Sequence, residues 1–277
     1  MKIIRKTKEL RKILETTKDP YKSIGLIMTM GNIHDGHLSL IKEAEKNNDY
    51  IITSIFVNPT QFNNEDDYNS YPNTLYEDIQ KLETSNCDLL YIPSINEIYP
   101  KGLVKEKSIL KYRNILCDIN RPGHFDGVTT VVNTIFKIIN PNNSYFGEKD
   151  YQQLKLIIEM VKLKKLNVNI IPCPSVRDNN GMSLSSRNSN FNSYQKKIFK
   201  NLSKKVNLFV ESLKQNNFKT NINDFKNELS NIGINKIDYL EIRDENSLKI
   251  SKDYKSARLF IAVHISDVRI IDNFKLY

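Results

Sequence analysis

Residues 24–41, with the sequence IGLIMTMGNIHDGHLSLI, decide the fold of this chain. The stretch opens with the short apolar run 24–28, which is typical of a strand buried within a parallel sheet. Apolar residues then recur at helical spacing between Leu38 and Ala44, which predicts a helix that continues through Glu45. In an open α/β sheet, ligands bind at such a strand-to-helix turn, beyond the carboxyl end of the strand.

The turn itself carries two glycines and two histidines. Gly31 and Gly36 let a ligand approach the main chain closely, and the helix start offers unpaired N–H groups that suit a phosphate. His34 and His37, three residues apart, can direct two imidazole N–H donors at one phosphate group. Such a pair alone is also compatible with surface, packing or zinc-binding roles, but no cysteine or third histidine lies nearby in the sequence. The pattern His-x-Gly-His after a strand therefore indicates nucleotidyl transfer through binding of a triphosphate.

Polar loops follow two further predicted strands. Asn58–Phe62 follows the β-branched run 50–57, and the amide of Gln61 could orient a small polar substrate or simply cap the turn. Residues 147–154 follow the run 144–146 and lead into a helix. Both loops are expected at the carboxyl ends of their strands, where a ligand would bind.

The segment 147–154 supplies several groups suited to phosphate chemistry. Gly147 permits close approach of a ligand, and Lys149 provides a point charge. Asp150 is placed to cap the following helix or to accept from a ribose hydroxyl. Gln153 faces the same crevice as Gln61 if the order of strands in the sheet allows it.

Two other loops carry candidate anion-binding groups. In the loop 176–188, Ser185, Ser186 and Arg187 suit phosphate oxygens, Arg187 through its bidentate fork; a solvated linker between domains is the alternative. The glycine-rich segment 121–128 leads into an apolar helix ended by Pro141, and it suits an anion or a mobile lid.

The remaining patterns predict an α/β protein with two domains. An amphipathic helix over 5–18, ended by Asp19-Pro20, opens the chain. Strands separated by helices up to residue 175 predict βαβ units and a parallel sheet in a first domain, 1–175. A long helix from residue 191 and strands at 237–242 and 258–265 predict a smaller α+β domain, 176–277.

Between these elements the local predictions rest on weaker patterns. Residues 63–70 are acidic and asparagine-rich and predict a loop, while 101–120 predict a weak strand and a helix. A helix over 75–85 has Thr74 as its cap. On that helix, Asp78 is either a magnesium contact or a solvated carboxylate.

Composition limits the function classes. The 277 residues are 39% hydrophobic and 26% charged, as in an ordinary globular protein. The net charge of +9 comes from lysines interleaved with acidic residues, so we expect help in attracting anionic substrates and no nucleic-acid binding. Three widely spaced cysteines predict reduced thiols, and the sequence shows no signal peptide and no membrane-spanning run. The expected location is cytoplasmic, with no membrane partner.

With these loops in view, the chain resembles the pantothenate synthetase (pantoate–β-alanine ligase) family nearly from end to end. The most specific match is Phe146-Gly147-Glu148-Lys149-Asp150-Tyr151-Gln152-Gln153, whereas His-x-Gly-His is shared with other nucleotidyltransferases and class I aminoacyl-tRNA synthetases. The other matching segments are 29–31 with 34–37, 58–62, 71–72, 121–125, 185–188, 238–244 and 269–273.

The resemblance implies a Rossmann-like domain, a smaller lid-like domain, a homodimer and a two-step reaction. ATP and pantoate would form pantoyl adenylate and pyrophosphate, and β-alanine would then displace AMP, with Mg²⁺ bridging phosphate oxygens. Residues implied to be catalytic are His34, His37, Lys149 and Arg187. Residues implied to contact ATP are Met30, Gly31, His34, His37, Gly147, Glu148, Lys149, Asp150, Val176, Leu184, Ser185, Ser186 and Arg187. Residues implied to bind pantoate or β-alanine are Gln61, Gln153 and Met30.

The sequence departs from the family pattern at three positions. Met28 stands where the family usually has Pro, Asn73 replaces an Arg after Tyr-Pro, and Leu184 replaces a Met of similar volume. These departures bear on catalytic rate more than on reaction class. Two alternatives stay open: a His-x-Gly-His adenylyltransferase that makes a dinucleotide, and a nucleotide- or RNA-binding protein that has lost catalysis.

Overall fold

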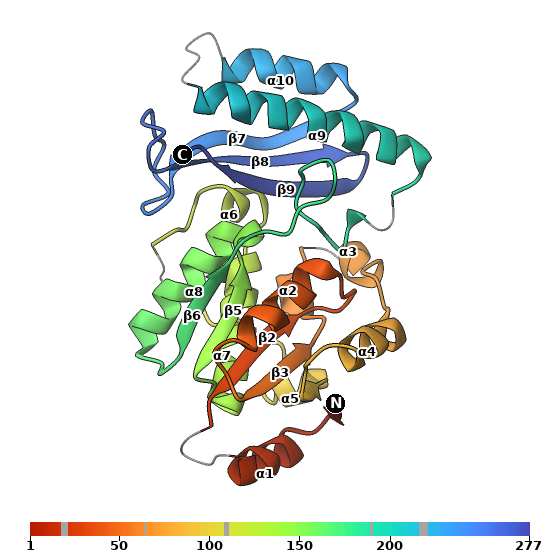
Figure 1. Cartoon of the computed structure of the whole chain (residues 1–277), viewed down its shortest axis with the longest axis vertical. Helices are drawn as coiled ribbons and strands as arrows, with labels where there is room; N and C mark the ends of the chain where they lie inside the picture. The colour runs from red at the N-terminus through yellow and green to blue at the C-terminus, as the bar shows by residue number, and fades with distance from the viewer. Residues whose placement is uncertain (18–21, 64, 108–110, 189–190, 216–220) are drawn as a thin grey trace. The chain divides into compact units, whose positions relative to one another are not determined.

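The computed structural model of the chain describes residues 1–17, 22–63, 65–107, 111–188, 191–215 and 221–277 (Figure 1). These residues form two compact units. Unit 1 comprises Met1–Glu148 and Gln153–Pro174, and unit 2 comprises Lys149–Gln152 and Ser175–Tyr277. The expected domains 1–175 and 176–277 stay a prediction. None of the helices formed by the described residues has the length and apolar character that a membrane span requires.

Unit 1 is built on a six-stranded parallel sheet, which confirms the predicted fold class. Its strands stand in the order β1-β4-β3-β2-β5-β6. Their bounds are β1 Lys2–Ile4, β2 Ile24–Thr29, β3 Tyr50–Ile55, β4 Leu89–Tyr91, β5 Asn143–Gly147 and β6 Asn169–Cys173. The apolar run of β2 is buried because it lies in the middle of this sheet, with β3 on one side and β5 on the other.

Helices alternate with these strands along the chain, as the βαβ pattern predicts. The longer ones are α1 Thr7–Thr17, α2 Asp35–Ala44, α4 Leu75–Glu83, α7 His124–Ile139 and α8 Tyr151–Lys164. Short helical turns are η1 Pro59–Gln61, α3 Glu65–Asn69, α5 Ile95–Ile98, α6 Cys117–Asn120 and η2 Glu148–Asp150. A buried apolar cluster joins α2 to the sheet through Leu40, Ile41 and Ala44, which pack with Ile27 and Ile51.

Unit 2 is a three-stranded antiparallel sheet with two helices on one face (Figure 1). The strands are β7 Lys236–Asp244, β8 Ala257–Ile265 and β9 Val268–Lys275, and the helices are α9 Ser193–Lys214 and α10 Ile222–Asn231. Alternate residues of β8, from Ala257 to Ile265, belong to the apolar cluster that the helices cover. The predicted smaller α+β part of the chain is therefore confirmed.

The structure corrects several local predictions. Residues 65–69 form helix α3 where a loop was predicted, and the described part of 101–120 contains a short helix and no strand. The strands β1 and β9 were not predicted. Helix α7 begins at His124, inside the segment predicted as a loop, and ends at Ile139 before a left-handed Asn140. The predicted stop of the first helix at Asp19-Pro20 lies outside the described residues.

Candidate active site

The histidine turn connects β2 to α2. His34 is the N-cap residue of α2, with an extended main chain, and its Nδ1 accepts from the N–H of Gly36 at 3.1 Å. The N–H of His34 in turn donates to Nδ1 of His37 at 3.4 Å. The two half-buried rings lie 4.1 Å apart between centroids, tilted by 31°. The three-residue spacing thus brings both imidazoles together at the start of a helix, as the sequence predicts.

These hydrogen bonds favour the same tautomer in both rings. A neutral imidazole has one N–H donor and one acceptor nitrogen, and in both rings Nδ1 is the acceptor. We infer that His34 and His37 carry their protons on Nε2 when neutral. Each ring therefore has an N–H donor on the side away from the main chain, beside the positive end of the α2 dipole.

Asp78 of α4 holds the main chain that precedes the histidines. Its carboxylate accepts from the N–H of Asn32 at 2.8 Å and from the N–H of Ile33 at 2.6 Å. Thr74 is the N-cap residue of α4, as predicted, but its hydroxyl donates to the carboxylate of Asp78 and makes no cap bond to the main chain of the helix. Asp78 is 1% exposed, so these bonds form away from solvent. The structure shows it as a buried group, and the solvated alternative is wrong.

Gly31 fits this arrangement for a steric reason. Its φ is +87°, a conformation that L side chains rarely adopt, and a Cβ there would lie 3.0 Å from Oδ2 of Asp78. A side chain at position 31 would strain the turn and displace the carboxylate that orders it.

The Gln61 loop follows β3 and begins with Asn58 as the cap of η1. The amide of Gln61 donates to the sulfur of Met30 at 2.8 Å, and its oxygen accepts from Asn58 at 3.1 Å. The loop is packed closely on α7, because a Cβ at Gly127 would lie 2.5 Å from the carbonyl oxygen of Thr60. Met30 and Gln61, which come from different strand ends, are thus in direct contact.

Two residues of the segment 121–128 fix the main chain of Gln61. Nη2 of Arg121 donates to the carbonyl oxygen of Gln61 at 3.1 Å, and Nδ1 of His124 lies 2.7 Å from the same oxygen. His124 is 8% exposed. The sequence indicated an anion site or a lid here. It gave no sign that these residues bind the carbonyl of Gln61, which lies 60 or more positions away along the chain.

The order of the strands in the sheet decides whether Gln153 and Gln61 can face the same crevice. Because β3 and β5 both flank β2, the loops after these three strands follow neighbouring strand ends in unit 1. Gly147 ends β5, and a Cβ built there meets no described heavy atom within 4 Å. Glu148 follows in η2, and Gln153 lies half-buried near the start of α8. The strand order therefore allows Gln153 to face the same crevice as Gln61, which stays a prediction.

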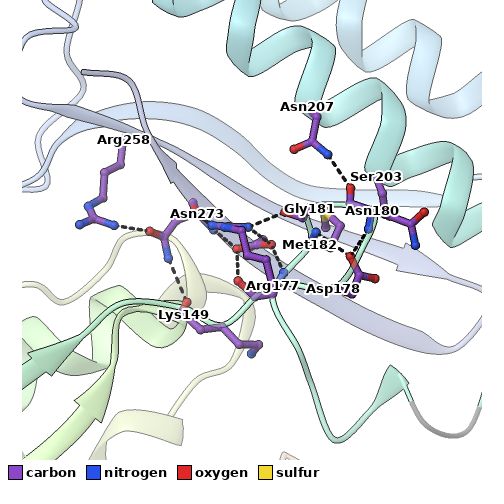
Figure 2. A network of polar contacts seen from close by, with 12 residues as sticks. Lys149, Arg177, Asp178, Asn180, Gly181, Met182, Ser203, Asn207, Arg258 and Asn273 are labelled. Atoms are coloured by element: carbon purple, nitrogen blue, oxygen red, sulfur yellow. Dashed lines mark hydrogen bonds and ion pairs between the residues drawn. The ribbon is translucent and has the colours of Figure 1, made fainter. Parts of the chain in front are cut away.

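Unit 2 contains the other candidate groups. Nζ of Lys149 lies 3.6 Å from Oδ1 of Asp150, and both residues are half-buried. The carbonyl oxygen of Lys149 accepts from the side-chain amide of Asn273 on β9 at 3.0 Å (Figure 2). Lys149 therefore combines a charged side chain with a main chain that a neighbouring strand fixes.

The loop 176–188 is ordered by its own hydrogen bonds and by one buried carboxylate. Arg177 pairs with Ser183 as an isolated bridge, and the N–H of Leu184 donates to the carbonyl of Val176 at 2.9 Å. Asp272 accepts from the N–H of Ser183 at 2.8 Å and from its hydroxyl at 2.6 Å. The solvated-linker alternative does not describe this segment.

The candidate phosphate ligands follow directly on that turn. Ser185, Ser186 and Arg187 are half-buried, and the N–H of Arg187 donates to the hydroxyl of Ser185 at 3.3 Å. The side chain of Arg177, at the base of the turn, donates to Asp272 at 3.0 Å. It also donates to the carbonyl of Gly181 at 2.9 Å (Figure 2). Arg177 thus braces the loop, a role that the sequence did not reveal.

Known proteins of one family match the chain over nearly its whole length. The sequence profile of the family described as Pantoate-beta-alanine ligase matches residues 2–275. A pantothenate synthetase from Thermosipho africanus is 38% identical over 281 residues, covering 99% of each chain. One from Francisella tularensis subsp. novicida is 44% identical over 254 residues, covering 91% of this chain and 89% of that protein.

Solved structures agree as well. The pantoate-beta-alanine ligase from Francisella tularensis, complexed with Beta-gamma ATP and Beta-alanine, has a TM-score of 0.87 at 41% identity, and the match covers 100% of this chain and 98% of that one. The pantothenate synthetase from Thermus thermophilus has a TM-score of 0.88 at 31% identity, with 100% of both chains covered.

Proposed function

The chain belongs to the pantoate–β-alanine ligase family, and from this we infer that it joins pantoate to β-alanine at the expense of ATP. In the first step a carboxylate oxygen of pantoate bonds to the α-phosphorus of ATP, and pyrophosphate leaves. In the second step the amine of β-alanine bonds to the acyl carbon of pantoyl adenylate, AMP leaves, and the amine releases a proton. The products are pantothenate, AMP and pyrophosphate.

The first step sets the chemistry that the protein must supply. A carboxylate is already a nucleophile, so no general base is required. The step requires the two substrates to be held in line and the charge on the phosphates to be neutralised. The observation that carries our assignment is that Nδ1 of both His34 and His37 accepts from the main chain at the start of α2, so that Nε2 is the protonated nitrogen of each neutral ring. We propose that these two N–H groups bind phosphate oxygens of ATP.

The remaining ATP contacts are proposed residue by residue. The side chains of Lys149, Ser185, Ser186 and Arg187 supply cations and hydroxyl donors for phosphate oxygens. The main chain at Met30, Gly31, Gly147 and Glu148, with Asp150, Val176 and Leu184, would contact the nucleotide. Gly147 supports this role because the space beside it admits close approach of a ligand.

Gln61, Gln153 and Met30 are the residues that we propose for pantoate, with Gln61 also serving β-alanine. Neutral amides suit this task because they bind hydroxyl and carboxylate groups without competing for the phosphates. The contacts of Gln61 with Met30 and Asn58 support the proposal, since they hold its side chain in one orientation.

Mg²⁺ is proposed to arrive with ATP. Within the described residues, no group of three or more His, Cys, Asp or Glu side chains is arranged to hold a metal ion, so the donors do not fit a cage built by the protein. Phosphate oxygens would supply most ligands, and the ion would neutralise part of their charge. Asp78 as an additional ligand stays a prediction; its observed bonds go to the histidine turn.

The chain is proposed to act as a cytoplasmic homodimer without nucleic-acid or membrane partners. The dimer rests on family resemblance alone. A reducing compartment is supported by the three cysteines, which are buried as thiols outside any disulfide of the described residues.

The proposed function is tested by product analysis. Purified protein with ATP, Mg²⁺, pantoate and β-alanine should form pantothenate and AMP in equal amounts, and omission of either acid should abolish both. Formation of a dinucleotide with pyrophosphate and no AMP would identify the alternative adenylyltransferase. Salt-sensitive RNA binding without ATP turnover would identify a binding protein that has lost catalysis.

A further inference from the structure

Adjacent residues of β9 point to opposite faces of the unit 2 sheet. Ile270 and Phe274 belong to the apolar cluster beneath α9 and α10, so Asp272, which alternates with them, lies on that face. Asn273 therefore lies on the other face, where its register partner on β8 is Phe260. Both polar residues are almost completely buried, at 3% and 2% exposure.

Asn273 is the point where several hydrogen bonds meet. Its side-chain oxygen accepts from Nη1 of Arg258 at 2.8 Å, and its side-chain nitrogen donates to the carbonyl oxygen of Lys149 at 3.0 Å. Its own carbonyl accepts from Nη2 of Arg177 at 2.7 Å. Figure 2 shows Asn273 between Arg258 and the main chain of Lys149.

The amide is oriented by its charged neighbour. A guanidinium can only donate, so Arg258 requires the oxygen of Asn273 to face it, and the NH₂ group is left to face Lys149. Arg258 is itself fixed, because it is 3% exposed, stacks over the Tyr151 ring at 4.0 Å and pairs with Glu245. The direction of the amide is thus set before any ligand binds.

We propose that Asn273 is a positioning residue that acts through Lys149. By fixing the Lys149 carbonyl, it fixes the main chain from which the ammonium group extends toward the phosphates of ATP. This inference rests on the proposed role of Lys149 in ATP binding. It gives a part in the family reaction to a residue that touches neither substrate nor cofactor. Asn273 lies 124 positions along the chain from Lys149, the residue that it orients.

Position 273 requires an amide because its two partners need an acceptor on one side and a donor on the other. An aspartate would still accept from Arg258, but it could not donate to Lys149, and two oxygens would face each other in a buried place. Asn273→Asp therefore removes one donor with almost no change in shape. Asn273→Ala, which introduces no charge, provides a second variant if the first folds poorly.

The test is a double-mutant cycle between Asn273→Asp and Lys149→Ala, measured by pantoate-dependent exchange of labelled pyrophosphate into ATP. We expect Asn273→Asp, and Asn273→Ala more mildly, to raise the KM for ATP or lower the exchange rate by about tenfold to a hundredfold, with the KM for pantoate nearly unchanged. In the Lys149→Ala background, Asn273→Asp should add little further loss. A merely structural residue would lower thermal stability and the amount of active protein in either background, without a selective change in the KM for ATP.

Asp238→Asn is the matched control. Asp238 is a buried carboxylate of the same sheet, but among the described residues its hydrogen bonds and ion pairs go to Arg269, Lys236 and His264 and not to Asn273 or Lys149. It should lower the melting temperature without changing the KM for ATP.

The failure of this inference can be told apart from the failure of the proposed function. If Lys149→Ala impairs exchange and Asn273→Asp does not, or if the two losses multiply, Asn273 does not act through Lys149 and the ATP role of Lys149 stands. If Lys149→Ala leaves exchange unchanged, the proposed role of Lys149 is wrong and this inference is overturned with it.

Discussion

The carboxylate of Asp78 binds the main-chain N–H of Ile33 at 2.6 Å, one residue before the first histidine of the turn. A second bond, from the N–H of Asn32 at 2.8 Å, makes Asp78 a bidentate acceptor for the turn. Lys81 of the same helix donates to the carbonyl of Ile33 at 2.6 Å. Helix α4 thus binds both the N–H and the carbonyl of Ile33, directly before the histidine turn.

Asp78→Asn should damage stability and activity together. An amide can replace only one of the two acceptor oxygens, so a buried N–H loses its partner and the free energy of unfolding should fall by about 1–3 kcal/mol. The displaced turn should lower pyrophosphate exchange by about tenfold or more. Urea unfolding and the exchange assay measure the two effects.

The control for this variant is Asp88→Ala, which loses a single carboxylate bond to the N–H of Ile51 near the start of β3. It should leave exchange unchanged. If Asp78 only holds the turn, the Mg²⁺ concentration for half-maximal exchange stays the same in Asp78→Asn; a marked rise would support Asp78 as a Mg²⁺ ligand.

Gln61→Ala should raise the KM for pantoate by about tenfold and leave the KM for ATP nearly unchanged, because the amide is proposed to bind the acid and not the nucleotide. Gln80→Ala on α4 is the control for loss of a glutamine. His124→Ala should reproduce part of the Gln61 effect, since His124 contacts the Gln61 carbonyl at 2.7 Å. An unchanged KM for pantoate in Gln61→Ala would refute this assignment.

Asp238 makes the stability of unit 2 depend on pH. Burial alone would raise the pKa of Asp238, but hydrogen bonds and charge from Arg269, with Lys236 and His264, lower it below the ordinary 3.8. A depressed pKa stabilises the folded state fully above the unfolded value and less as pH falls through the folded value. The stability difference between wild type and Asp238→Asn should therefore shrink below pH 3.8 in urea titrations. A difference that is constant with pH would contradict this.

Cys173 should resist thiol reagents in the folded protein. Burial, with the nearby carboxylates of Glu43 and Glu148, raises the pKa of its thiol to about 11. At pH 8 only about one thiol in a thousand would be ionised, and the thiolate is the reactive form. Labelling with a disulfide reagent should be slow in buffer and reach three thiols per chain after unfolding, since the sequence has three cysteines. Rapid labelling of Cys173 in folded protein would contradict the burial.

Local patterns predicted the elements that carry the histidine turn because strand, glycines and helix are contiguous there. They missed β1, which has three residues, and β9, in which Asp272 and Asn273 interrupt the apolar alternation. They also missed α3, whose five residues include none that is buried.

The supporting contacts of the site could not be predicted in the same way. Asp78 and Ile33 are 45 residues apart, and Asn273 and Lys149 are 124 apart, so only the folded chain reveals their pairing. The sequence identified groups suited to bind ligands by their type and spacing. It could not identify the groups that orient them, because the role of a residue such as Arg177 depends on which residues it contacts in the folded chain.

The adenylate step and the role of the histidine turn are tested together by pantoate-dependent exchange of labelled pyrophosphate into ATP, without β-alanine, in wild type and in His37→Ala. We expect exchange that requires pantoate and falls by about a hundredfold or more in the variant, because one of two paired phosphate donors is lost. No exchange by folded wild-type protein with Mg²⁺ present would contradict the adenylate mechanism. Full exchange by folded His37→Ala would contradict the role of the histidine turn.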